Sequence, residues 1–175
     1  MSFNQVNYRN ILKANYNIDK IDLPATVYID GMKYDSVGVR FKGQTSYSQV
    51  QNSDKKSFNL TLDYAIDNQD IEGYKTLNLN KAFQDASFIH EIMGKQLIRN
   101  HIPAARSNYS LLYLNDQYWG LYANVQQLNK KFYKQWFLTN NGTSWRADSE
   151  ASQPWYSWVE FFRLRYSTLS EILHA

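Results

Sequence analysis

The sequence predicts an α+β fold, in which an antiparallel sheet packs a helix on one face. Two patterns lead to this prediction. Between residues 25 and 79, short runs of alternating apolar and polar residues are separated by turn residues, as in half-buried strands. From Asp85 the apolar residues recur at intervals of three and four, as on one face of a helix, and a further pair of strands follows.

The first half of the chain is expected to form a short helix and four strands. The helix is predicted near Gln5–Asn15, and the strands are predicted at Ala25–Asp30, Tyr34–Lys42, Ser57–Leu62 and Thr76–Leu79. The alternation is clearest where Val37, Val39 and Phe41 stand between polar or small residues. The first two strands are joined by Asp30-Gly31, a dipeptide typical of tight hairpins.

The principal helix is expected at Ala86–Asn100. Its apolar residues share one face, and they are Phe88, Ile89, Ile92, Met93 and Leu97. Asp85 or Ser87 is expected to cap the first turn, because a short side-chain oxygen can accept hydrogen bonds from free backbone amides. Pro103 follows the end of this helix.

A hairpin and two further helices complete the prediction. The hairpin strands are expected at Ser110–Leu114 and Tyr118–Gln126, joined by the turn Asn115-Asp116. Asn129 can cap a helix at Lys130–Phe137. The aromatic residues between Trp155 and Leu164 predict a helical tail after Pro154.

Composition excludes several classes of function. The 175 residues are 43% hydrophobic with a net charge of +3, so a globular domain is expected. Lys and Arg are spread along the chain, so no nucleic-acid groove is predicted. The absence of cysteine excludes disulfides and thiolate metal sites. No apolar run is long enough to span a membrane, and His90, His101 and His174 lack the spacing of a zinc motif.

The loop Gly43-Gln44-Thr45-Ser46 directly follows a predicted strand and is a candidate phosphate site. A phosphate needs a glycine for close backbone approach, together with amide and hydroxyl donors. Gly43, Thr45 and Ser46 supply these groups. The alternative is a plain turn, because glycine and hydroxyl residues are common where a strand ends.

Lys55 and Lys56 precede the strand Ser57–Leu62, so one of them is expected on each side of the sheet. A lysine over the sheet could hold phosphates as a point charge, whereas edge lysines could instead discourage aggregation. In protein kinases a helix glutamate pairs with such a lysine, and Glu91 is the candidate. On a helical wheel, however, Glu91 lies beside Lys95 and away from the apolar stripe, which favours a solvated i, i+4 pair.

Aromatic residues gather in the predicted hairpin. They are Tyr109, Tyr113, Tyr118, Trp119 and Tyr122. Cross-strand aromatic pairs stabilise a sheet, although the same rings could line a slot for adenine or a sugar. No catalytic motif is complete, since the sequence has no Walker A loop and no HRD or DFG triplet.

Several stretches, taken in order, resemble the spore-coat protein H (CotH) kinase family. They are Val37–Ser46, Lys55–Leu60, Tyr74–Asn80, Asp85–Glu91, Ile102–Arg106 and Tyr113–Tyr122. The resemblance runs from about Leu23 to Phe137. It implies the N-terminal lobe of an atypical protein-kinase-like fold. The implied division is an N-terminal segment at 1–22, the kinase-like lobe and hinge at 23–138, and an aromatic tail at 139–175.

The resemblance also implies a reaction. Members of this family transfer phosphate from ATP, with Mg or Mn, to Ser or Thr of coat or secreted proteins, which implies a spore-coat, cell-surface or secreted location. By position, Gly43–Ser46 would form the phosphate-side loop. Lys56 would hold the phosphates, with Lys42 as the second choice, and Glu91 would be the helix partner of that lysine.

The sequence departs from the family pattern at several positions. Gln126 or Gln127 stands where the family has a glutamate, and His90 stands where it has an arginine. The catalytic and metal-binding aspartates of the family lie in a C-terminal lobe, to which no segment before Ala175 shows a resemblance. We therefore expect an incomplete kinase that is inactive alone. The alternative is a non-catalytic binding or coat-assembly module that keeps the kinase-like fold.

Overall fold

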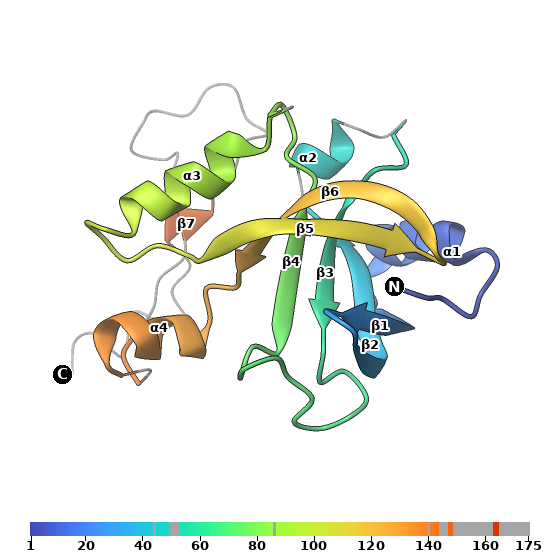
Figure 1. The fold of residues 1–175 in the computed structure, drawn as a ribbon, viewed down its shortest axis with the longest axis horizontal. Coiled ribbons are helices and arrows are strands. Elements are labelled where there is room, and N and C mark those ends of the chain that lie inside the picture. The colour runs from blue at the N-terminus through green and yellow to red at the C-terminus, as the bar shows by residue number, and fades with distance from the viewer. Residues whose placement is uncertain are drawn as a thin grey trace. The chain divides into compact units, whose positions relative to one another are not determined.

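The computed structural model describes residues 1–43, 45–49, 53–85, 87–139, 141–143, 147–148 and 163–164. The chain divides into two compact units, Met1–Leu138 and Thr139–Ala175. The described residues of the first unit form a six-stranded antiparallel sheet and four helices (Figure 1). In the second unit, the described residues include a two-stranded pair formed by β7 (Ala147–Asp148) and β8 (Arg163–Leu164).

The sheet confirms the predicted α+β class and its antiparallel pairing. Its strands are β1 (Leu23–Ile29), β2 (Met32–Lys42), β3 (Ser57–Thr61), β4 (Thr76–Asn80), β5 (Ser107–Leu114) and β6 (Gln117–Gln126). They are arranged in the order β1-β2-β3-β4-β6-β5, and each neighbouring pair is antiparallel. Because β6 pairs with β4, strands β1 and β5 are left as the two edges.

Four helices accompany the sheet. They are α1 (Tyr8–Ile18), α2 (Thr45–Ser48), α3 (Ile89–Ile98) and α4 (Lys130–Phe137). The bounds predicted for α4 are confirmed, whereas the short helix α2 lies where the sequence predicts only a loop. Most of the predicted helical tail lies outside the described residues. At Arg163 and Leu164 the prediction of a helix is wrong, because these two residues pair with β7.

Strand register divides the central side chains between two faces. Val39 lies opposite Leu60, and the next residue, Arg40, lies opposite Asn59 on the other side of the sheet. The α1 face is formed by Val39, Phe41, Phe58, Leu60 and Leu79. The α3 face is formed by Arg40, Lys42, Ser57, Asn59, Asn78 and Asn80. One face is therefore apolar, and the other carries amides and cations.

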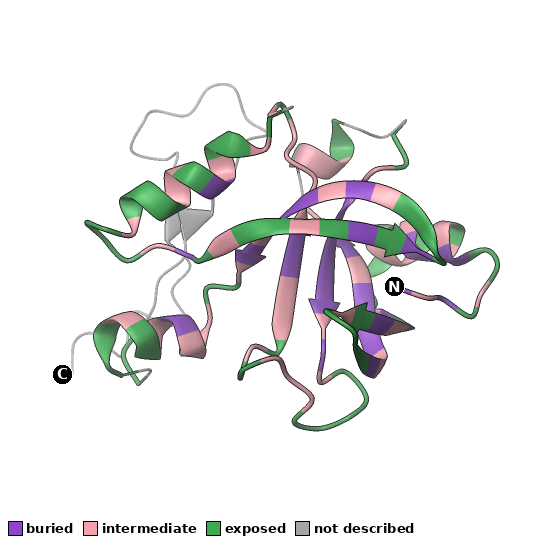
Figure 2. Cartoon of the chain, viewed as in Figure 1, coloured by how far each residue is buried: buried purple, intermediate pink, exposed green. Residues whose placement is uncertain are grey.

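The α1 face holds the main core (Figure 2). Helix α1 contributes Tyr8 and Leu12 to it, and the chain before the helix contributes Met1 and Phe3. Ser2 also forms an antiparallel bridge with Thr26 of β1. Residues that precede the first strand therefore pack into the same core as the sheet.

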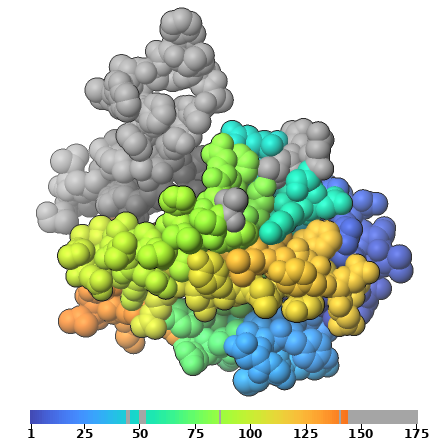
Figure 3. All heavy atoms as spheres, turned by 45° about the horizontal axis from the view of Figure 1, so that its top comes forward, coloured from blue at the N-terminus to red at the C-terminus, as the bar shows by residue number. Residues whose placement is uncertain are grey.

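The α3 face is covered less completely. Ile92 is buried against Ala105, Ala123 and Val125, and it is the one buried residue of α3. The sequence predicts an apolar stripe that packs on the sheet, but the side chain of Leu97 is 61% exposed. The physical reason is that α3 packs beside the edge strand β5 and does not lie across the sheet (Figures 1 and 3).

Candidate functional site

A cavity of about 440 Å³ opens where β2 ends beside the first turn of α3. It is lined by Lys42, Gly43, Ser46, Ser57, Asn80, Ala82, Phe83, Asp85, His90 and Glu91. Four of the six site residues predicted from the sequence thus line one cavity, namely Lys42, Gly43, Ser46 and Glu91. Of the other two, Lys56 does not line it, and the side chain of Thr45 lies outside the described residues.

Lys42 is the last residue of β2, and register places it on the α3 face opposite Ser57. Its Nζ donates to Asn78 Oδ1 at 3.1 Å. Burial lowers the pKa of Lys42, while the Glu91 carboxylate raises it and Lys95 lowers it further. Lys42 is thus a partly desolvated cation within the field of the helix glutamate.

Glu91 reaches the cavity from the first turn of α3. Its Oε1 accepts from Lys95 Nζ at 2.9 Å, which confirms the i, i+4 pair expected from the helical wheel. The same oxygen accepts from Asn80 Nδ2 at 2.7 Å, so a strand of the α3 face also holds it. The two interpretations of Glu91 are therefore compatible, because the carboxylate that pairs with Lys95 also faces the sheet.

A network of buried side-chain amides holds the Lys42 ammonium in place. Asn78 is only 4% exposed, and its Oδ1 accepts from Lys42 and from Asn59 Nδ2. Its Nδ2 donates to Val125 O at 3.2 Å and to Gln127 Oε1 at 2.8 Å. Asn59 Oδ1 is buried without a partner among the described residues. All hydrogen-bonding groups of the Asn78 side chain are thus committed to holding its neighbours.

These asparagines were not identified as site residues from the sequence, although a signal exists. Asn78 and Asn80 alternate within a short strand, and asparagine is depleted in strands. A polar residue that recurs with period two marks one face of a sheet. The sequence alone does not say that this face is covered, because that depends on where α3 packs.

Gly43 is the turning point between β2 and α2. Its φ is +98°, a backbone conformation that side chains other than hydrogen rarely adopt, so the position favours glycine. The Tyr16 hydroxyl donates to Gly43 O and ties the turn to α1. The backbone at Gly43 is therefore held rigidly beside Lys42.

Asp85 organises the first turn of α3 at the opposite wall of the cavity. The N-cap position is occupied by Phe88 at φ 59°, but Ser87 Oγ accepts from Ile89 N at 3.2 Å, so a predicted residue does satisfy a free amide of the first turn. Asp85 accepts from His90 N at 2.9 Å, and its Oδ1 lies 2.9 Å from His90 Nδ1. The Ser87 hydroxyl, followed by His90, holds the pKa of Asp85 at about 2, against an opposing effect of desolvation.

Lys56 has a different environment. It is 2% exposed, and its Nζ lies 4.5 Å from the ring centre of Tyr47, which packs against the main core. Burial is the largest cause that lowers its pKa, followed by the charge of Lys13. Strand alternation explains the placement, since Lys56 shares the parity of Phe58 and Lys42 pairs with Ser57. The second-choice lysine, and not the first, therefore lines the cavity with Glu91.

The described residues show neither a metal cluster nor a membrane-spanning helix. Within them, no three His, Cys, Asp or Glu side chains are grouped to hold a metal ion. Among the described helices, none is long and apolar enough to cross a membrane.

Comparison with known proteins adds one family. The sequence model of the family described as CotH kinase protein matches residues 39–163, which is well over half of the chain. The match includes Lys42, Asn78 and Glu91. No curated protein matches the chain.

Proposed function

Because the chain belongs to the CotH kinase protein family, we propose that it binds the phosphate groups of ATP in the cavity lined by Lys42 and Glu91. The observation that carries the proposal is the convergence of a partly desolvated lysine, a glycine turn with positive φ and a helix glutamate on one cavity. Each group comes from a different part of the chain. A lysine, a glycine turn and a glutamate together can bind an anion such as phosphate and hold it in a fixed position.

The donor set fits phosphate oxygens. Lys42 supplies a point charge, Gly43 allows close approach of the backbone, and Ser46 supplies a hydroxyl. Glu91 is shared by Lys95 and Asn80, so it only partly compensates Lys42. The negative charge of a phosphate would therefore offset the desolvation that lowers the pKa of Lys42.

The reaction proposed for this family's site is transfer of a phosphoryl group to a Ser or Thr hydroxyl of a coat or secreted protein. When bound, ATP supplies that phosphoryl group. In this chain Lys42 would hold the phosphates, and Asn78 would keep the Lys42 ammonium in place. The proposal assigns no metal ligand to this chain, since no three His, Cys, Asp or Glu side chains are grouped among the described residues.

Calorimetric titration with ATP, with and without Mg or Mn, tests this proposal through binding. Lys42→Met should weaken ATP binding about tenfold or more, because it removes charge-assisted hydrogen bonds. Lys56→Met is the matched control, since it removes a buried lysine that does not line the cavity. Adenosine, which has no phosphate, should bind equally to wild type and Lys42→Met.

Two outcomes would contradict the proposal. If Lys56→Met weakens ATP binding and Lys42→Met does not, Lys56 is the phosphate-holding lysine that the family resemblance implies. If the folded wild-type chain does not bind ATP, the cavity is not a phosphate site in this chain. Far-ultraviolet circular dichroism must show that each variant is folded.

A further inference from the structure

Among the described residues, the middle of the edge strand β5 is left open beyond its contact with α3. Its sequence, Ser107–Leu114, contains no charged residue and no proline, and Leu111 is 62% exposed. Proteins usually protect such edges with lysine, proline or a cover, because an open edge pairs with other strands. An uncharged edge of this length is therefore a candidate interaction surface.

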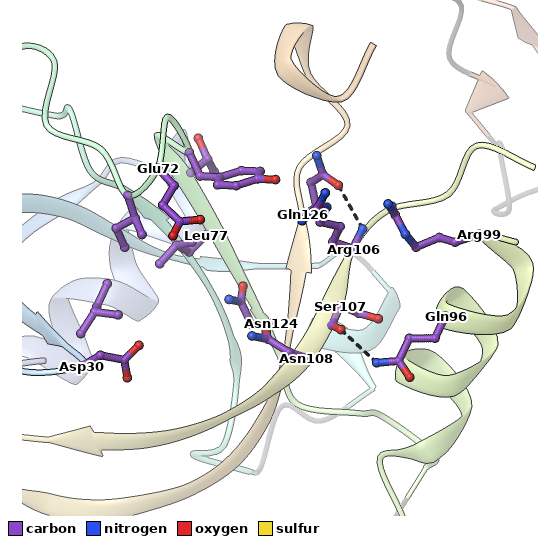
Figure 4. Close-up of a pocket in the computed structure, with 14 residues that line it drawn as sticks. Asp30, Glu72, Leu77, Gln96, Arg99, Arg106, Ser107, Asn108, Asn124 and Gln126 are labelled. Atoms are coloured by element: carbon purple, nitrogen blue, oxygen red, sulfur yellow. Dashed lines mark hydrogen bonds between the residues drawn. The ribbon is translucent and has the colours of Figure 1, made fainter. Parts of the chain in front are cut away.

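Hydrogen bonds at its two ends show which backbone groups point outward. Tyr113 O accepts from the Met1 amino group at 2.8 Å, and Ser107 O accepts from Gln96 Nε2 at 3.5 Å (Figure 4). Because backbone direction alternates along a strand, the N–H and C=O groups of Tyr109 and Leu111 point the same way. Among the described residues, no hydrogen-bond partner exists for these four groups.

The open edge borders a cleft of about 590 Å³. One wall is Asn108–Tyr113 of β5, and the opposite wall is Val27–Ile29 of β1, the other edge of the sheet. The floor includes Leu60, Leu77 and Leu79. The curl of the sheet thus brings both of its edges to one cleft with an apolar floor.

The chain itself shows how an extended segment fits between these edges. Ser2 exchanges two backbone hydrogen bonds with Thr26, at 2.7 and 3.0 Å. Met1 donates to Tyr113 O and accepts from Asn115 N at 2.9 Å. One end of the gap is therefore closed by an extended segment bonded to β1 and to the β5–β6 hairpin.

Charge further defines the occupant. The side chains of Asp30 and Asp116 line the cleft, and among the described residues no Lys or Arg does so. Asp116 lies near the Met1 amino group, which leaves Asp30 as the available charge. Arg99 and Arg106 belong to the adjoining cavity of about 570 Å³, on the side opposite Asp30 (Figure 4).

We propose that this cleft binds an extended peptide segment of another protein by β-strand addition to β5. Its backbone bonds to Tyr109 and Leu111, and alternate apolar side chains lie over the leucine floor. A basic residue of the peptide lies beside Asp30. A second copy of this chain fits less well, because its own β6 would have to accompany β5 into a gap bounded by two edges. Peptide binding in this cleft is independent of phosphate binding in the cavity of Lys42.

The probe is the capped octapeptide acetyl-KTVTVTVK-amide, in which polar Thr and apolar Val alternate between two terminal lysines. A generic sequence suffices, because main-chain hydrogen bonds supply much of the affinity in strand addition. Titration into the isotope-labelled chain should shift the amide resonances of Tyr109, Leu111 and Val27–Ile29. The same peptide with N-methylated valines, which cannot donate from those positions, should bind about tenfold more weakly or worse.

A matched pair of variants tests the edge directly. Leu111→Pro removes an outward N–H and obstructs the incoming strand, so it should abolish binding. It leaves the hydrogen bonds to β6, so the strand should stay folded. Leu111→Thr keeps the N–H and should retain binding. Asp30→Asn keeps a residue that tolerates the positive φ of this turn and should weaken binding several-fold.

Three outcomes would overturn the proposal. The first is a folded wild-type chain that shows no amide shifts at millimolar peptide. The second is equal binding by Leu111→Pro and Leu111→Thr. The third is a dimer of the wild-type chain in size-exclusion chromatography that Leu111→Pro dissociates, which would assign the edge to a second copy.

Discussion

The two faces of the central sheet are built from neighbouring residues of the same strands, yet they differ in almost every physical respect. On β3, Leu60 points to the α1 face and Asn59 to the α3 face. The α1 face is filled by apolar side chains from α1 and the N-terminal residues. The α3 face carries Lys42 and buried asparagines that are hydrogen-bonded to one another. Burial of these polar groups costs free energy unless hydrogen bonds compensate for the loss of water.

This difference separates stability from chemistry. Hydrophobic burial on the α1 face supplies the driving force for folding, because buried apolar area is the main favourable contribution. The α3 face contributes less to stability, but it places a cation and a carboxylate at the wall of a cavity. The same strands therefore supply both a scaffold and a candidate site.

The largest expected effect is on the α1 face. Leu60→Ala removes a side chain that is 1% exposed and should lower the free energy of unfolding by about 2–5 kcal/mol. Urea denaturation followed by tryptophan fluorescence measures this change. The neighbouring change Asn59→Ala is the control, and it should cost about 1 kcal/mol or less, because one hydrogen bond to Asn78 is lost.

If Asn59→Ala destabilised the chain as much as Leu60→Ala, the separation of the two faces would be wrong. The unpartnered Asn59 Oδ1 is the reason for expecting the opposite. Removing a buried oxygen without a hydrogen bond removes a desolvation penalty as well as an interaction.

The next largest effect is expected at Asn78. Asn78→Leu removes the acceptor of Lys42 and Asn59, and it should lower the free energy of unfolding by about 1–3 kcal/mol. The double variant Lys42→Met/Asn78→Leu should recover part of this loss, because no ammonium is then left without its acceptor. Additive effects of the two changes would show that Asn78 does not hold Lys42.

A smaller effect is expected where α1 touches the site. The Tyr16 hydroxyl donates to Gly43 O, and its ring stacks on Tyr47 with centroids 3.6 Å apart. Tyr16→Phe keeps the stacking and removes the hydrogen bond, so it should cost about 1 kcal/mol. Hydrogen exchange should become faster near Gly43 but not in β3. Unchanged exchange near Gly43 would mean that α1 does not support the turn.

Much of the sheet was predictable because its signals are local. Alternation located β2 and β3, and Asn129 does accept from Lys131 N and Phe132 N as the predicted cap of α4. The family resemblance from the sequence is confirmed by the family match. Local signals do not reveal which element covers which face, so the exposure of Leu97 on α3 was not predicted.

The site was predictable in part for the same reason. The family resemblance placed Gly43 and Glu91 among the candidates and both line the cavity, but the choice between Lys42 and Lys56 depends on register. A shift of one residue moves a side chain to the other face, and only pairing with β2 fixes that parity. Asn78 was missed because its role depends on contacts with three different strands and the chain after β6.

The smallest expected effect concerns the first turn of α3 and its dependence on pH. Asp85 has a pKa of about 2 in the folded chain, below the ordinary value of 3.8, because Ser87 and His90 bond its carboxylate. A depressed pKa means that the carboxylate stabilises the fold above about pH 4, and that this contribution is lost as the pH falls toward 2. The difference in free energy of unfolding between wild type and Asp85→Asn should therefore become smaller as the pH falls from 4 to 2. Urea midpoints at each pH measure it, and parallel curves for the two proteins would show that Asp85 does not anchor α3 at the wall of the cavity.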